Sequence, residues 1–315
     1  MRIRTVAFIL ASVGLILFCL ASPRTARADS YTYTFINPPG ATSSAANGIN
    51  ASGEIVGGEV NGGVTEGFLD DAGVFSVINP PSSTQSEAFG INDSGEIVGE
   101  DSTNSVGFLD DGGTYSVINP PGSTNTYAYG INDSGAIVGA DNLGGVENGF
   151  LYNGSTYTEL DAPGATATAA AGINASGEIV GAEDNGGVEE GFLYNGSTYT
   201  VINPPGAALS EALGINDSGE IVGTEIVGGV QEGFLDDAGT YTIINPPGAL
   251  ESEAWDINDS GYISGTEVTS TFEEGFLATP SSAPEPGALP LLATGLLALA
   301  MLSLHRKRKI ASEPC

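Results

Sequence analysis

The sequence predicts an all-β protein whose body is a closed ring of six similar units. Three observations support this: a motif recurs at a nearly constant spacing, each repeat contains four strand-like stretches, and the array is incomplete at both ends. The motif is Gly-Ile-Asn, with a sixth, degenerate copy, and its copies start at Gly48, Gly90, Gly130, Gly172, Gly214 and Asp256. The steps are therefore 42, 40, 42, 42 and 42 residues. Four strands in about 42 residues are typical of one blade of a β-propeller.

Each repeat reads as four short strands separated by Gly-rich turns. In the second repeat we expect these strands at residues 87–92, 96–99, 107–109 and 114–118. The fourth strand ends at Asn119-Pro120-Pro121. Because Pro cannot donate to a ladder, this strand is expected at an edge of its sheet. No stretch of the repeat shows a helical period.

The first strand of each repeat is predicted to lie nearest the axis. Its residue two before the motif is always Ala, as at Ala46 and Ala88, and we expect crowding at the axis to require this small side chain. The second repeat is two residues shorter than the others, and the deletion falls between Gly90 and Gly107. An even deletion within a hairpin preserves the two faces of both strands.

The ends of the array predict closure. Residues 31–39 (YTYTFINPP) resemble a fourth strand with no preceding three, and no fourth strand follows Gly275-Phe276-Leu277. The strand sets are complete only if the amino-terminal strand joins the last repeat. An open solenoid, the main alternative together with a sandwich, would instead need capping repeats. We therefore expect a six-bladed β-propeller over residues 29–279.

Charge is distributed very unevenly. All 8 Lys and Arg residues and the single His lie outside residues 29–279, whereas 37 of the 39 carboxylates lie inside, since only Glu285 and Glu313 fall elsewhere. A body without cations cannot neutralise phosphates, which excludes nucleic-acid binding. Cys19 and Cys315 also lie outside it. We therefore predict no catalytic residue, no disulfide and no enzyme activity in the body.

Residues 1–28 are predicted to be a signal peptide. A basic start at Arg2 and Arg4 precedes an apolar run over residues 6–21, and Ala26-Arg27-Ala28 supplies a small-x-small cleavage site at Ala26 and Ala28. The export machinery and signal peptidase are therefore expected partners, and the mature chain is expected to begin at Asp29.

The carboxyl-terminal segment combines three signals. A linker at 280–286 contains Pro284-Glu285-Pro286, and 18 uncharged residues, 287–304, follow it. As a helix they would span about 27 Å, enough to cross a bilayer. A basic cluster then holds this end in the cytoplasm; it comprises Arg306, Lys307, Arg308 and Lys309. We expect a transmembrane helix and basic cluster over 287–309 and a tail at 310–315.

This order of tripeptide, apolar helix and basic cluster resembles the PEP-CTERM sorting signal. The resemblance implies an exosortase-type processing enzyme, an inner-membrane-anchored precursor, and a final location at the cell surface or in the extracellular matrix. Two features depart from the pattern: Ala283 precedes the tripeptide where Val is common, and the six-residue tail follows the basic cluster. A plain single-pass anchor is the alternative.

The repeats themselves resemble the extracellular HAF-type repeat. The matching elements in the third repeat are Gly130-Ile131-Asn132, Gly135, Val138-Gly139 and Phe150-Leu151. The His that names the repeat is absent, because Gly precedes Phe in every copy. The resemblance implies an exported repeat protein and supplies no substrate.

Three patterns were considered as chemical sites. The oxygens of Asn92-Asp93-Ser94-Gly95-Glu96 suit Ca²⁺, but Asx-Gly turn chemistry explains the motif, and Ala51 and Ala175 replace the Asp in two repeats. The recurrent Asn-x-Ser follows from the same turns. A carboxylate pair acting as glycosidase acid and base needs no cation, but requires one blade to differ from the rest. We interpret Trp255, an aromatic exception in the sixth repeat, as core packing.

Together these patterns favour an exported, non-enzymatic binding or structural module, with extracellular polysaccharide as a candidate partner and no cofactor. A carbohydrate-active propeller and a Ca²⁺-dependent adhesin are the alternatives, because a fold does not decide among functions.

Overall fold

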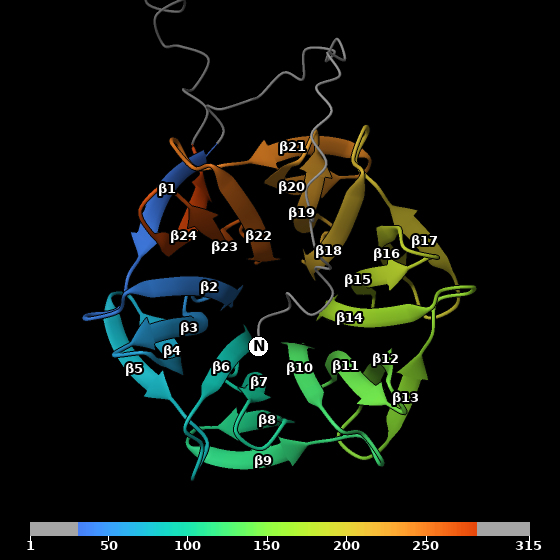
Figure 1. The fold of residues 1–315 in the computed structure, drawn as a ribbon, viewed down its shortest axis with the longest axis horizontal. Helices are drawn as coiled ribbons and strands as arrows, with labels where there is room; N and C mark the ends of the chain where they lie inside the picture. Colours follow the sequence, from blue (N-terminus) through green and yellow to red (C-terminus); the bar gives the residue numbers. More distant parts are fainter. Residues whose placement is uncertain (1–30, 282–315) are drawn as a thin grey trace, which may run out of the picture. The chain divides into compact units, whose positions relative to one another are not determined.

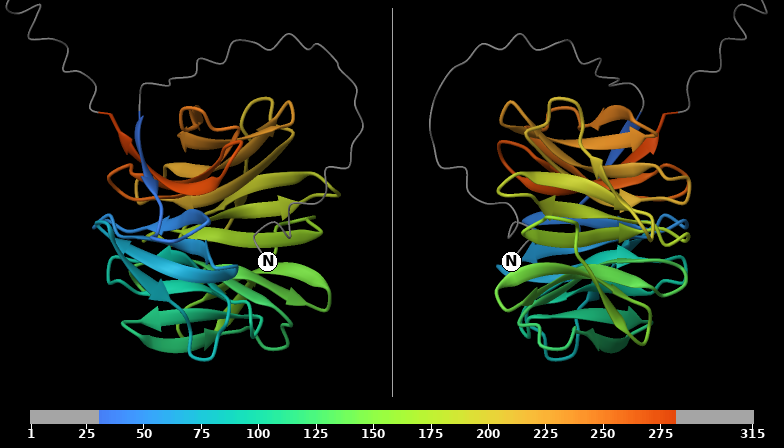
Figure 2. Two further views of the ribbon diagram at one scale, coloured as in Figure 1. Left: turned by 60° about the vertical axis from the view of Figure 1, so that its left-hand side comes forward. Right: turned by 90° about the vertical axis from the view of Figure 1, so that its right-hand side faces the viewer.

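The computed structural model describes residues 31–281, which form six four-stranded antiparallel sheets arranged as a ring (Figure 1). Figure 2 shows the same blades from two sides. The all-β, six-bladed β-propeller is therefore confirmed. Among the described residues no helix is long and apolar enough to span a membrane. The predicted signal peptide, sorting tripeptide and carboxyl-terminal helix lie outside this range.

Each of the first three blades consists of four consecutive strands. The first blade comprises β2 (Ser43–Ile49), β3 (Ile55–Asn61), β4 (Val64–Asp71) and β5 (Val74–Ile78). The second comprises β6 (Ser86–Ile91), β7 (Ile97–Asp101), β8 (Val106–Asp111) and β9 (Thr114–Ile118). The third comprises β10 (Thr126–Ile131), β11 (Ile137–Leu143), β12 (Val146–Tyr152) and β13 (Tyr157–Leu160).

The fourth and fifth blades follow the same plan. The fourth comprises β14 (Ala167–Ile173), β15 (Ile179–Asp184), β16 (Glu189–Tyr194) and β17 (Tyr199–Ile202). The fifth comprises β18 (Leu209–Ile215), β19 (Ile221–Val227), β20 (Val230–Asp237) and β21 (Thr240–Ile244). The sixth contains β22 (Glu251–Ile257), β23 (Ile263–Val268) and β24 (Glu273–Pro280), and takes its outer strand from the other end of the chain.

That outer strand is β1 (Tyr31–Ile36), and the sheet order β1-β24-β23-β22 confirms the predicted closure. Figure 1 shows β1, at the blue end of the chain, beside the orange-red β24. The Tyr33 ring meets the Phe276 ring edge-on at a centroid distance of 5.6 Å. Tyr31 and Tyr33 also pack on the apolar cluster of the sixth blade. The last blade is thus completed by residues from the start of the body.

The core lies between the blades. Each of six clusters joins one face of a blade to the opposite face of the next. Between the first and second blades, for example, Val56 and Ile78 pack against Ala88, Ile97 and Phe108. Because every blade takes part in two such contacts, the ring buries apolar side chains without any central core.

In each blade, a Gly of the second strand lies opposite a Phe of the third strand. Gly57 lies opposite Phe68 in the register of β3 and β4, and a Cβ on Gly57 would lie 2.9 Å from the Phe68 ring. All six equivalent Phe rings are fully buried. The second blade keeps the pairing, with Gly99 opposite Phe108, although its hairpin is shorter. The prediction that the deletion leaves both strand faces unchanged is therefore confirmed.

The crowding at the axis occurs at the motif Gly and not at the Ala two residues before it, which corrects the prediction made for Ala46 and Ala88. Ala88 is fully buried, but it packs against Gly67 of the preceding blade. The close approach of neighbouring inner strands occurs at the motif Gly. A Cβ on Gly90 would lie 2.7 Å from the carbonyl oxygen of Tyr129 in the next blade. Small residues are thus needed at two positions for two different contacts.

Candidate functional site

The inner strand of every blade contains a β-bulge just before the motif. In β10 the register passes from Ala128 to Gly130 and leaves Tyr129 unpaired, and each of the other five inner strands shows the same shift. The six bulged residues are Asn47, Phe89, Tyr129, Ala171, Leu213 and Trp255. The residue type differs in every blade, whereas the Ile-Asn that follows the motif's first residue never changes. The residue just before the motif therefore varies from blade to blade, whereas the Ile-Asn of the motif does not.

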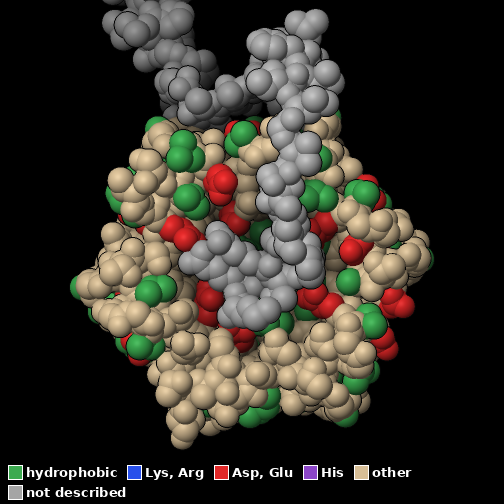
Figure 3. Space-filling view, viewed as in Figure 1, with side chains coloured by type: hydrophobic (Ala, Val, Ile, Leu, Met, Phe, Trp, Pro, Cys, Tyr) green, Lys and Arg blue, Asp and Glu red, His purple; other side chains and the backbone are tan. Residues whose placement is uncertain are grey.

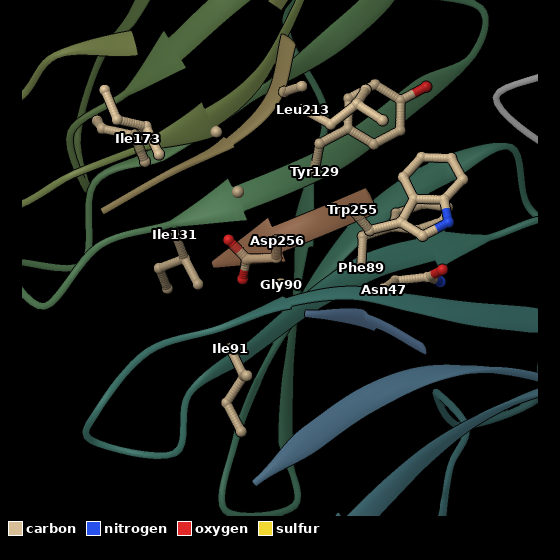
Figure 4. A pocket seen from close by; sticks show the side chains of 14 residues that line it. Asn47, Phe89, Gly90, Ile91, Tyr129, Ile131, Ile173, Leu213, Trp255 and Asp256 are labelled. Carbon is tan, nitrogen blue, oxygen red and sulfur yellow. The ribbon is translucent and has the colours of Figure 1, made fainter. Parts of the chain in front are cut away.

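The bulged residues surround a pocket on the propeller axis. All six line it, together with motif residues including Gly90, Ile131 and Asp256. Its empty space, which includes the open solvent at its mouth, is about 520 Å³. Figure 4 shows Tyr129, Trp255 and Asn47 on one side of Asp256, with Ile131 and Ile173 on the other. The pocket thus has an aromatic side and an aliphatic side.

The aromatic side is built from neighbouring blades. The Tyr129 ring lies 5.2 Å from the Phe89 ring and stacks on Tyr127 at 5.6 Å. Trp255 is only partly buried, and its Nε1 donates a 3.1 Å hydrogen bond to Oγ1 of Thr266. The interpretation of Trp255 as core packing is therefore wrong, because the side chain lines the pocket.

Asp256 supplies a carboxylate where the other five motifs have Gly. Its Oδ2 accepts a hydrogen bond from the backbone N–H of Ile49 at 3.0 Å, and its Oδ1 accepts one from the N–H of Ile257 at 2.9 Å. Burial raises the pKa of this carboxyl to about 7, although the two N–H groups oppose the rise. The group is partly exposed to the pocket. An ionisable side chain is thus fixed on the axis.

Three glutamates from three consecutive blades act on one another electrostatically, and two of them also act on Tyr129. Burial raises the pKa of Glu147 to about 6, and the carboxylate of Glu211 adds to the rise. Burial raises the pKa of both Glu189 and Glu211, and the neighbouring carboxylate of Glu211 adds to the rise at Glu189. Glu147 and Glu211 also act on Tyr129, whose pKa burial raises well above its usual value. We call Glu147, Glu189 and Glu211 the glutamate group.

Acidic side chains gather around the axis on the face in Figure 3, and no Lys, Arg or His appears among the described side chains.

The glutamate group bears on the glycosidase alternative. Such an enzyme needs one protonated carboxyl as the acid and one ionised carboxylate as the nucleophile or base. Burial raises the pKa of both Glu189 and Glu211, which does not match that division of roles.

The Asn-Asp motif at the other end of the pocket connects the blades. Each motif Asn donates from Nδ2 to the backbone oxygen of the next motif Asn, from Asn50 to Asn92 at 3.3 Å and finally from Asn258 back to Asn50 at 2.9 Å, in a closed ring of six hydrogen bonds. Asp133 accepts from the N–H of Asp93. These oxygens serve the Asx turns and the inter-blade bonds, which agrees with the turn interpretation of the motif.

Within residues 31–281 no group of three or more acidic, His or Cys side chains has a geometry that would hold a metal ion. The predicted sorting and cleavage residues lie outside the described range, namely Ala26, Ala28, Pro284, Glu285, Pro286, Arg306, Lys307, Arg308 and Lys309. The sequence patterns did not predict that the bulged residues line a pocket or that the glutamate group comes together. For the pocket, the sequence does contain a signal: the residue just before the nearly constant Gly-Ile-Asn motif differs in every repeat.

Comparison with known proteins identifies the fold alone. No family model and no curated sequence matches the chain. A gluconolactonase from Xanthomonas campestris is similar with a TM-score of 0.51 and 11% identity, over 82% of this chain and 94% of that one. A streptogramin B lyase has a TM-score of 0.48 and 11% identity over 82% and 100%. YCF48 bound to a peptide has a TM-score of 0.42 and 13% identity over 77% and 85%.

Proposed function

We propose that this chain is an exported, non-enzymatic β-propeller that binds an extracellular glycan in its axial pocket. The observation that carries the proposal is the variation at the bulge: six different residue types, one from each blade, line one pocket, whereas the Ile-Asn of the motif is the same in every blade. Aromatic rings suit the C–H face of a sugar, and the Asp256 carboxylate and Asn47 amide supply polar contacts.

The proposal includes a route to the cell surface. The PEP-CTERM-like segment would direct an exosortase-type enzyme to remove the apolar helix after export. Glu285→Ala is expected to leave the precursor in the inner membrane with the helix attached. Intact-mass measurement of the exported protein tests this, and an exported form that retains residues 287–304 would favour a plain anchor.

Glycan-array binding by the purified protein tests the binding function. Trp255→Ala should abolish or strongly weaken the signal, and the fourth blade already carries Ala171 at this bulge, so the backbone accommodates Ala. Phe272→Ala is the matched control, because this exposed aromatic residue does not line the pocket. Equal binding by both variants would place the ligand elsewhere, and an empty array would overturn glycan binding.

A further inference from the structure

The axial pocket and its surroundings carry negative charge that no cation balances. Residues 31–281 contain no Lys, Arg or His, so neither Asp256 nor the glutamate group has a cationic partner among the described residues. An anionic ligand would meet only like charge, and burial weakens screening by salt. The ligand is therefore neutral or positively charged.

Asp256 is held in place to act as an acceptor. The backbone N–H groups of Ile49 and Ile257 fix its two oxygens, yet each carboxylate oxygen can accept a further hydrogen bond. Asp256 and Tyr129 are the only titratable side chains that line the pocket among the described residues. A donor entering the pocket would therefore meet one oriented carboxylate.

Two buried polar atoms near the glutamate group are unsatisfied. Glu189 is 9% exposed, and its Oε1 has no hydrogen-bond partner. Thr224 is 7% exposed, lies directly opposite Glu211 in the register, and its Oγ1 also has no partner. Buried polar atoms in native proteins are normally satisfied by protein, water or ligand. The unpaired atoms thus indicate missing donors at this place.

The aromatic side chains add a second attraction for positive charge. A ring face attracts an ammonium group by about 0.5–2 kcal/mol, most strongly when water is excluded. Trp255, Tyr129 and Phe89 line the same pocket as Asp256. The rings also offer a surface for the C–H face of a sugar. Aromatic faces beside an unbalanced carboxylate match a ligand that is both saccharide and cation.

We infer that the bound glycan carries free amino groups, with its sugar ring against the half-buried Trp255 and its ammonium group on the Asp256 carboxylate. The inference rests on the proposed glycan binding and deepens it by naming the ligand class. Acetylation of the amino group removes its positive charge but leaves the shape of the sugar ring unchanged. The free amine and its acetylated form therefore differ in the charge that the pocket is inferred to recognise.

Calorimetric titration of the purified protein with two disaccharides tests the inference. One is built from glucosamine and the other from N-acetylglucosamine. At pH 7 and low salt we expect at least 10-fold tighter binding of the free amine. Asp256→Gly should remove most of this preference and should still fold, because Gly is the residue of the other five motifs. Asp237→Asn makes a similar change in charge at an exposed residue outside the pocket, and should leave the affinity unchanged.

The outcomes separate this inference from the function on which it rests. Equal affinity for both disaccharides, or a preference that survives in Asp256→Gly, would overturn the amine inference and leave glycan binding intact. Spermidine binding as tightly as the amino disaccharide would overturn the role of the sugar ring. If no glycan of any charge binds, both the inference and the proposed function fail.

Discussion

The Oδ2 of Asp256 accepts a hydrogen bond from the backbone N–H of Ile49 at 3.0 Å, across 207 residues of sequence. This bond joins the sixth blade to the first. At the other junctions the motif Gly leaves no room, since a Cβ on Gly130 would lie 2.6 Å from the carbonyl oxygen of Ala171. The junction that closes the ring is therefore the one that admits a side chain, and it places a carboxyl group on the axis.

Asp256 should make the protein less stable as the pH rises. Its ordinary pKa is 3.8 and its folded pKa is about 7, so the folded state binds the proton more tightly. The stabilisation is complete below about pH 4 and is lost as the pH rises through 7, at a cost of about 1–3 kcal/mol for a partly exposed group. Denaturant unfolding at pH 5 and pH 8 should show a smaller difference in Asp256→Gly than in the wild type. Identical differences would contradict the raised pKa.

Deletion of residues 31–36 should destabilise the whole propeller. It removes the outer strand of the sixth blade, exposes the edge of β24, and takes Tyr33 and Ile36 from two inter-blade clusters. We expect the melting temperature to fall by more than 10 °C or the chain to fail to fold. Phe35→Ser, at an exposed position of the same strand, should have little effect. An unchanged melting temperature after the deletion would show that closure is dispensable.

Asn132→Ala should destabilise the ring far more than Asp133→Ala. The buried Asn132 donates to Asn174 O at 3.0 Å and accepts from the N–H groups of Ser134 and Ala136. Its loss should cost about 1–3 kcal/mol per buried group left unpaired.

Asp133 is the matched control, because two repeats already have Ala at this place and its bond to the Asp93 N–H is exposed. We expect Asp133→Ala to cost less than about 1 kcal/mol in urea unfolding. If the two variants lose equal stability, the Asn ring is not the stabilising element.

Added salt should stabilise the protein. Thirty-six carboxylates lie in residues 31–281, since Asp29, Glu285 and Glu313 are excluded from the 39, and no cation offsets them. Their repulsion is screened over about 10 Å at 0.1 M salt and ~3 Å at 1 M. The melting temperature should rise with NaCl, and Mg²⁺ should act at lower concentration by diffuse attraction.

CaCl2 and MgCl2 at equal concentration provide the control for specific metal binding. Diffuse screening predicts similar effects of the two ions. A large effect of Ca²⁺ alone, or a fall in melting temperature with a chelator, would instead support the Ca²⁺-dependent alternative.

The sequence alone determined the architecture, because the architecture is repeated. Six copies of one pattern predict the number of strands and the hairpin that absorbs the deletion. The split at the ends requires that residues 31–36 complete the last blade. The charge composition likewise predicts that the body does not bind nucleic acid. The strands and the closure of the ring follow from local patterns and from the ends of the array, so both could be predicted from the sequence.

Only the tertiary structure decided what faces the axis. A bulge shifts the alternation of a strand by one residue, and in the sixth blade it leaves Trp255 unpaired at the pocket. The closest approach of neighbouring inner strands falls at the motif Gly, not at the Ala two residues before it. The glutamate group joins residues 147, 189 and 211, which come from three blades and occupy two different positions of the repeat. Their proximity arises from the ring that stacks the blades, which no single repeat encodes.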